Sequence, residues 1–142
     1  MKLGLSALAI WAAALWWGAL TSVGFGVVPM LFANLPTPAM AGAMAAKLFS
    51  ALTWLAVGCG MLLLIIFRLN QPLALINKAR VAIFFVAFGM LLALLSEYAV
   101  APRIVARQDL RLWHSVGTVL YALQWVCAGV TFWMLAGRKP EA

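Results

Sequence analysis

Acidic and titratable side chains are scarce in this sequence. Its 142 residues include three Asp and Glu residues and one His, and 9% of the chain is charged. A water-soluble domain carries roughly a quarter of charged residues and is about half apolar, whereas this chain is 67% hydrophobic. Because a soluble domain of this length leaves roughly a third of its unfolded surface exposed, the composition excludes a water-soluble fold. The surrounding medium must be a lipid bilayer.

Cysteine is scarce as well. Cys59 and Cys127 both lie inside apolar runs, and the chain has no Cys-x-x-Cys motif. Two such residues provide neither a disulfide framework nor a zinc site. Free cysteine in apolar sequence behaves as a small hydrophobic residue, so we expect two buried thiols.

The few titratable groups leave little material for catalysis. Acid–base and nucleophilic mechanisms need paired groups within hydrogen-bond reach, and Glu97 with His114 is the sole candidate pair. We expect Glu97 to form an ion pair with Lys47 or a nearby Arg instead, which is a structural role. The sequence therefore predicts no catalytic residue and a protein that is not an enzyme.

Cofactor ligands are equally few. A haem held between membrane helices usually has two axial ligands, and His114 would need a methionine or a second subunit as its partner. Thioethers and imidazole suit Cu(I), and Met30, Met40, Met44 and His114 form a weak candidate set. Methionine in apolar helices is mostly packing material. We expect no metal and no cofactor, with copper and haem as the weaker alternatives.

Long apolar runs are what the chain has in abundance. They cover about residues 5–32, 50–67, 81–100 and 112–135. The second run lies in a helix that we expect to begin near residue 38, because Thr37 can cap a helix and Pro38 can occupy its first position. A span needs about 20 apolar residues, and the first run is longer than the apolar part of a secretory signal. The sequence predicts one membrane domain over residues 1–142, an all-α polytopic protein with a bundle of four transmembrane helices.

The basic residues predict the orientation of these spans, because short cytoplasmic loops are enriched in Lys and Arg. The side that holds both termini carries Lys2, Arg68, Lys78, Arg80, Arg138 and Lys139, and the opposite side carries Lys47, Arg103, Arg107 and Arg111. We therefore expect an N-in/C-in protein. The net charge of +7 lies at the ends of apolar runs, which is typical of contact with lipid head groups. Membrane lipids are the expected partners, and nucleic acid is not.

The region from Glu97 to His114 is where polar groups gather. If one helix continued through it, Arg103, Arg107, Arg111 and His114 would follow one face, and Thr118 and Tyr121 would extend that face into the last span. The basic groups either reach lipid phosphates from the interface or form an anion or head-group site backed by His114. Ionisable groups at spans are functional candidates by default. The predicted outer-face pocket is Lys47, Glu97, Arg103, Arg107, Arg111, His114, Thr118 and Tyr121.

Small residues recur every four positions along the first span. Ala14, Gly18, Ser22 and Gly26 form a ridge that would let another helix approach closely in lipid. A helix-packing face is the main interpretation. This ridge would serve a structural or assembly protein that packs against a second copy or another membrane protein.

Several segments together resemble a known family. They are Gly24 to Phe32, Leu35-Pro36, Ala46 to Phe49, Ala101 to Arg107 and Arg111 to His114. This chain resembles the transmembrane-protein-205-like family, catalogued as domain of unknown function 4149, over nearly its whole length. The resemblance implies a small four-span protein in which Pro29, Phe32, Pro102, Arg107 and His114 are the family-type positions. It supplies architecture rather than an activity.

Taken together, these features favour an uncharacterised integral membrane protein that binds or moves a small molecule, an ion or a lipid head group through the outer-face pocket. The alternative is the structural or assembly role of the small-residue ridge. We expect the protein in the cytoplasmic (inner) membrane of a bacterium.

Overall fold

The fold was analysed in a computed structural model, which describes residues 2–69 and 76–137. Its elements are α1 (Lys2–Ser22), the π-helical turn η1 (Val23–Val27), α2 (Val28–Asn34), α3 (Pro38–Leu69), α4 (Ile76–Leu95), the π-helical turn η3 (Ser96–Val100), α5 (Ala101–Val105) and α6 (Leu110–Ala136). No strand occurs within these two described ranges.

Four helical segments are long and apolar enough to cross a membrane: Gly4–Asn34, Pro38–Leu69, Arg80–Val105 and Leu110–Ala136. At about 1.5 Å per residue each exceeds the ~30 Å hydrocarbon thickness of a bilayer, so all four project from it or tilt. The prediction of an all-α membrane protein with four transmembrane helices is confirmed.

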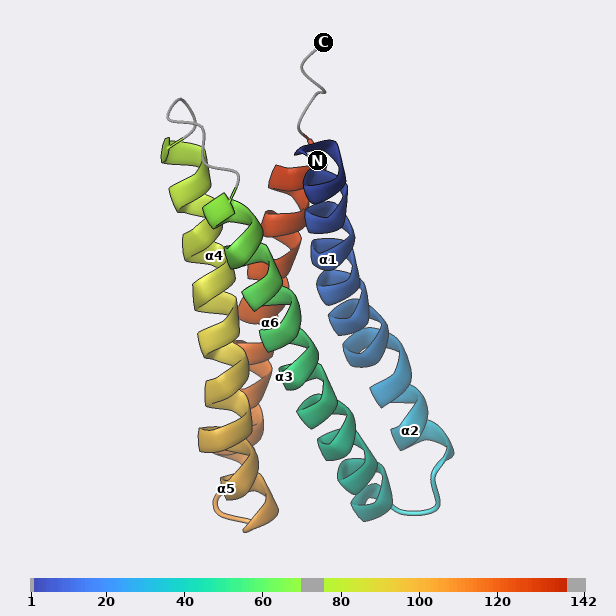
Figure 1. The fold of residues 1–142 in the computed structure, drawn as a ribbon. Helices are drawn as coiled ribbons and strands as arrows, with labels where there is room; N and C mark the ends of the chain where they lie inside the picture. The colour runs from blue at the N-terminus through green and yellow to red at the C-terminus, as the bar shows by residue number, and fades with distance from the viewer. Residues whose placement is uncertain (1, 70–75, 138–142) are drawn as a thin grey trace.

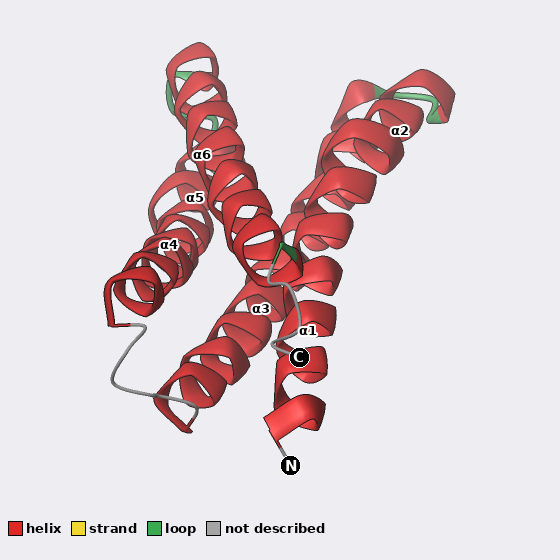
Figure 2. Cartoon of the chain, turned by 90° about the horizontal axis from the view of Figure 1, so that it is seen from above, coloured by secondary structure: helices red, strands yellow, loops and turns green. Residues whose placement is uncertain are grey.

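The helices run up and down as two hairpins (Figure 1). The start of α1, the end of α3, the start of α4 and the end of α6 lie at one end, and α2, α5 and the starts of α3 and α6 lie at the other, here named the α2–α5 end. Figure 2 shows that α2 diverges from α5 and the start of α6 toward this end.

Helix caps explain where two of the spans begin. The Thr37 hydroxyl accepts a hydrogen bond from the Met40 N–H at 3.3 Å, and Pro38 opens α3. The carboxylate of Asp109 accepts from the Leu112 N–H at 3.2 Å at the start of α6. Both caps satisfy N–H groups that have no partner within the helix.

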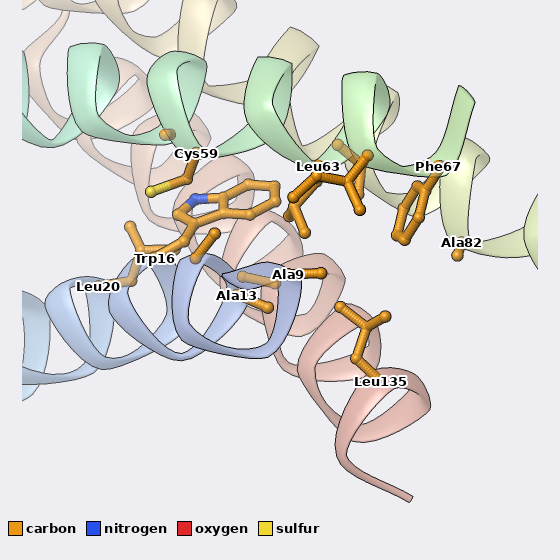
Figure 3. Close-up of a cluster of buried hydrophobic side chains, with 14 of the residues drawn as sticks. Ala9, Ala13, Trp16, Leu20, Cys59, Leu63, Phe67, Ala82 and Leu135 are labelled. Carbon is orange, nitrogen blue, oxygen red and sulfur yellow. The ribbon is translucent and has the colours of Figure 1, made fainter. Parts of the chain in front are cut away.

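One apolar cluster joins all four spans (Figure 3). Ala9, Ala13, Trp16 and Leu20 form the inward face of α1, and both Trp16 and Leu20 are fully buried. The Trp16 ring fits against Gly89 of α4 so closely that a Cβ at Gly89 would lie 2.7 Å from it. Cys59 belongs to this cluster, and both Cys59 and Cys127 are buried free thiols, as expected.

The small-residue ridge lies outside that core. Ser22 is exposed, and a Cβ added at Gly18 or Gly26 would meet nothing within 4 Å. Within the described chain, the ridge therefore packs no other helix of the bundle. The first span packs against the other helices through a different face. That face holds Ala9, Ala13 and the bulky Trp16 and is turned toward the core.

Proline and a π-helical turn occur together in two spans. Val28 N–H donates to Val23 C=O, Ala101 N–H donates to Ser96 C=O, and in both cases a proline (Pro29, Pro102) is the second residue after the π turn. Proline lacks an N–H and crowds the preceding turn, and a π turn widens the helix there. The third span nevertheless continues through Pro102 as a helix to Val105.

Candidate functional site

A hydrogen bond from α6 to α1 marks the level where the π turns lie. The Tyr121 hydroxyl donates to the Leu20 carbonyl at 2.5 Å. In a regular α-helix the Leu20 carbonyl would accept from the N–H of Gly24, and the Tyr121 ring and hydroxyl lie directly over Gly24, where a Cβ would come within 2.5 Å of the ring. A side chain inserted at such a point interrupts the regular ladder, which accounts for the position of η1.

The same tyrosine contacts the second span. Phe49 of α3 meets the Tyr121 ring edge-on, with ring centroids 5.4 Å apart. One turn further along α6, Trp125 donates to the Thr21 hydroxyl at 2.8 Å, and its ring contacts Phe25 and Trp17. Aromatic side chains thus connect α1, α3 and α6 at this level.

Glu97 of the third span also contacts α3 at this level. Its side-chain oxygen Oε1 accepts a hydrogen bond from the Ser50 hydroxyl at 2.6 Å, and Ser50 follows Phe49 on α3. Glu97 and Gly24 are each the second residue of a π turn. The layer formed by Gly24, Phe49, Ser50, Glu97 and Tyr121, here named the four-span layer, therefore draws on every span.

The predicted ion pair of Glu97 is wrong for the residues that the structure describes. No Lys or Arg nitrogen there lies within 4.0 Å of its carboxylate; the recorded partner of Glu97 is Ser50. The reason is geometric, because the nearest arginine along the chain is occupied elsewhere. Arg103 donates to the Ala99 carbonyl and places its guanidinium 4.5 Å from the centre of the Trp113 ring.

The four-span layer lies well within the length of the helices that are apolar enough to cross a membrane. Ser50, Tyr121 and Glu97 are about 12–18 Å along their helices from the α2–α5 end, taking 1.5 Å per residue. Glu97 falls within the apolar segment Arg80–Val105. A carboxylate at this depth is costly to retain.

The predicted arginine face is interrupted. Helix α5 ends at Val105, and the turn that follows has Arg107 at φ 53° and Asp109 at φ 26°. Since a continuous helix is absent there, Arg103, Arg107, Arg111 and His114 do not form one stripe. Arg103, Arg107 and Arg111 are all exposed at the α2–α5 end.

The other predicted pocket residues are dispersed around the same end. Lys47, His114 and Thr118 are exposed, and the Thr118 hydroxyl donates to the His114 carbonyl of its own helix at 2.8 Å. Of the predicted set, Glu97 and Tyr121 are the two that the structure brings into the four-span layer. Gly24, Phe49 and Ser50 also belong to that layer, and the sequence analysis did not name them as site residues. Ser50 could have been found, because it is a polar residue one helical turn from Lys47, which was predicted to line the pocket.

The methionines of the weak metal set are exposed at the same end. Met40 and Met44 lie on the first turns of α3, and Met30 lies on α2. Met30 lines an open apolar pocket of about 400 Å³ with Val27, Leu31, Asn34 and Leu35. Among the described residues, no group of three or more His, Cys, Asp or Glu side chains could hold a metal ion.

Comparison with known proteins gives a family but no characterised relative. The family model described as "Domain of unknown function (DUF4149)" matches residues 11–113, which contain most of the first span, the second and third spans, both π turns and the start of α6. No curated protein and no solved structure matches the chain. With most of its length covered by that match and four helices suited to crossing a membrane, this chain is a membrane protein that belongs to the DUF4149 family.

Proposed function

We propose that this chain is a non-enzymatic protein that binds a small molecule, an ion or a lipid head group at its α2–α5 end and moves it to and from the four-span layer. The hydrogen bond between Ser50 and Glu97 is the observation that carries the proposal. A membrane-embedded carboxylate is expensive unless it serves a purpose, and structural pairing with a cation, its commonest purpose, is absent from the described part of the chain.

The surroundings of Glu97 support an approach from the α2–α5 end. Lys47, Arg107, Arg111, His114 and Thr118 are exposed there. Exposed cations at a membrane surface attract phosphate and carboxylate groups. A ligand would meet this basic rim first and Glu97 second.

The proposal includes sidedness and location. The α2–α5 end faces outward and both termini face inward, because six basic residues lie on the termini side and four on the other. The protein resides in the cytoplasmic membrane of a bacterium, with membrane lipids as its constant partners.

Glu97→Cys tests whether water reaches the layer. Membrane-impermeant methanethiosulfonate reagents are added to protein in proteoliposomes, and the wild type, whose two thiols are buried, gives the background. Tyr98→Cys is the matched control, because Tyr98 is the next residue and is 63% exposed on the face toward lipid. The proposal expects Glu97→Cys to react faster than Tyr98→Cys. Equal, background-level labelling of both positions would rule out an open path to Glu97.

A structural or assembly role is the second candidate, and the small-residue ridge favours it. Gly18 and Gly26 have open space where a side chain would lie, and small residues on a lipid-facing helix allow close approach of another helix. A second copy of the chain or another membrane protein would be the partner. The two candidates are compatible, since the ridge and the four-span layer involve different faces of the first span.

A further inference from the structure

We infer that this chain is a duplicated helical hairpin and that its two halves pivot on each other about the contact between Trp16 and Gly89, opening and closing the bundle at its α2–α5 end. The first half is residues 2–69 and the second half is residues 76–137. The duplication requires no ligand. The movement rests on the proposed function, because it names how the four-span layer is opened to the α2–α5 end.

The two halves have the same order of elements. Each contains a long helix, a π turn, a short helix and a second long helix: α1, η1, α2 and α3 in the first half, and α4, η3, α5 and α6 in the second (Figure 1). The π turns begin 73 positions apart, at Val23 and Ser96, and the same interval separates Pro29 from Pro102. A proline and a π turn that recur together at one fixed interval indicate a repeated structural unit.

Burial recurs at the same interval. Buried positions of α1 are buried again 73 residues later in α4: Ala9 with Ala82, Ala13 with Val86, Trp16 with Gly89 and Leu20 with Ala93. Buried positions of α3 are buried again 72 residues later in α6: Leu52 with Gln124, Ala56 with Ala128, Cys59 with Thr131 and Leu63 with Leu135. Any amphipathic helix has a buried stripe, but a shared register also requires the two halves to enter the core at the same depth.

Equivalent residues of the two halves meet at two places. Trp16 lies against Gly89, its counterpart 73 positions later, and Phe49 packs edge-on against Tyr121, its counterpart 72 positions later. In a symmetric pair, a residue contacts its own counterpart only near the two-fold axis. Because α1 and α4 begin at the same end of the bundle (Figure 1), that axis runs along the bundle, as in membrane proteins built from parallel repeats.

Hydrogen bonds join the two halves at the four-span layer and within one turn of it. Three side-chain bonds link the first half to the second, and they are here named the interhairpin bonds: Ser50 to Glu97, Tyr121 to Leu20, and Trp125 to Thr21. One of them runs from α3 to η3 and two run from α6 to α1. The bonds therefore hold the halves together on both sides of the axis.

Between the four-span layer and the α2–α5 end, each half packs on itself. Helix α2 packs against α3, and α5 packs against α6. In the second half this packing is close, since a Cβ added at Gly117 of α6 would lie 3.4 Å from the Val100 side chain. The halves can therefore separate at this end without either of them being unpacked.

On the other side of the layer, large side chains of one half fit against glycines of the other. Trp16 of the first half lies against Gly89 of the second, and Met90 of the second half lies against Gly60 of the first. Trp16 is fully buried. Exposing a buried indole ring costs more than exchanging one hydrogen bond. The Trp16–Gly89 contact is therefore retained when the interhairpin bonds break, and the halves turn about it.

Spin-label distances measured in lipid nanodiscs test the movement. Both native cysteines, which are buried, are replaced by alanine, and labels are attached at exposed positions through Asn34→Cys on α2 and Val105→Cys on α5. Removing two interhairpin bonds with Ser50→Ala and Tyr121→Phe should lengthen the main distance between the labels by about 5 Å or more. With the bonds intact, the shorter distance should dominate. If the double variant fails to fold, Ser50→Ala alone provides the comparison.

Two further label pairs distinguish a movement of whole halves from a local distortion. Leu15→Cys with Leu91→Cys measures the separation of the halves near the level of Trp16, and Asn34→Cys with Met61→Cys lies within the first half; all are exposed. Both distances should change by less than about 2 Å. An unchanged distance between α2 and α5, or an equal change within the first half, would overturn the movement.

The movement and the proposed function can fail separately. Fixed halves combined with a reactive Glu97→Cys would reject the pivot and keep an open path to the layer. Moving halves combined with an unreactive Glu97→Cys would keep the pivot and reject the path.

Transposing the pair on the axis tests the duplication without any movement. Trp16→Gly leaves a cavity and Gly89→Trp overfills the core, so each should lower the melting temperature in detergent. The two changes together return one indole ring to the same space from the opposite half and should recover at least about half of the loss. Trp16→Gly with Gly60→Trp is the matched control, because Gly60 faces Met90 instead, and it should recover none. Equal melting temperatures, or equal folding yields, for the transposed and control proteins would overturn the duplication.

Discussion

Tyr121 on the last span donates its hydroxyl hydrogen to the carbonyl of Leu20 on the first, at 2.5 Å, two residues before α1 ends and the π turn η1 begins. This bond joins α6 to α1 at that level. Because Phe49 packs on the same ring and Ser50 bonds Glu97, one tyrosine positions the aromatic and the acidic parts of the four-span layer together.

Gly24→Ala should destabilise the protein. Its new methyl group would lie 2.5 Å from the Tyr121 ring, and forced overpacking of a core typically costs about 1–3 kcal/mol. Gly18→Ala is the matched control on the same span, because nothing lies within 4 Å of its added Cβ; alanine should be neutral or slightly stabilising there. Thermal unfolding in detergent measures both. Equal melting temperatures for the two variants would contradict the Tyr121–Gly24 contact.

Ser50 and Glu97 should be energetically coupled. A double-mutant cycle with Ser50→Ala, Glu97→Ala and the double variant compares the free energies of unfolding in detergent. Hydrogen bonds to charged groups contribute about 1.5–3 kcal/mol, so the cycle should give a coupling of that order. As a control, pairing Glu97→Ala with Lys47→Ala should give additive effects, because no ion pair joins those residues. Coupling with Lys47 in place of Ser50 would mean that the originally expected ion pair forms in the membrane.

Sidedness is testable with single cysteines at the two ends. Thr37→Cys and Gln108→Cys lie in the turns of the α2–α5 end, and Gly137→Cys follows α6 at the opposite end. In intact cells, an impermeant thiol reagent should label the first two and leave Gly137→Cys unlabelled until the membrane is opened. The reverse pattern would place both termini outside and the basic rim in the cytoplasm.

The small-residue ridge makes a prediction about assembly. Gly18→Leu with Gly26→Leu fills a face that contacts no helix of the described bundle, so folding should be little affected. If the ridge packs a second copy, the double variant should shift the protein from dimer to monomer in cross-linking or in analytical ultracentrifugation. Leu91→Ala, at an exposed position on α4, is the control. An oligomeric state that is identical in all three proteins would reject the ridge as a self-association face.

Much of the fold could be predicted from the sequence because bilayer thickness constrains helix length so strongly. The apolar runs and the Thr37-Pro38 signal follow from local chemistry, and the helix beginning at Pro38 depends only on neighbouring residues. The arginine stripe was wrong because its prediction assumed one continuous helix. Two residues with positive φ, Arg107 and Asp109, interrupt it, and periodicity alone gives no sign of such a break.

The candidate site was harder to predict because it depends on contacts between distant residues. Ser50 bonds Glu97 across 47 positions, and Tyr121 bonds Leu20 across 101. Glu97 and Tyr121 were recognisable as polar groups in apolar sequence, whereas Gly24 and Phe49 look like ordinary membrane residues. Trp16, rather than the regular small-residue ridge, determines which face of α1 turns inward, since burying its ring outweighs close backbone approach.

An experimental structure of the protein in a lipid nanodisc would test the central claim most directly. The account predicts a hydrogen bond from the Ser50 hydroxyl to Glu97 near 2.6 Å, no Lys or Arg nitrogen within 4.0 Å of that carboxylate, and density for a bound group or water beside Phe49 and Tyr121. A Glu97 carboxylate paired with Lys47 or an arginine, with side chains filling the space beside those rings, would contradict it.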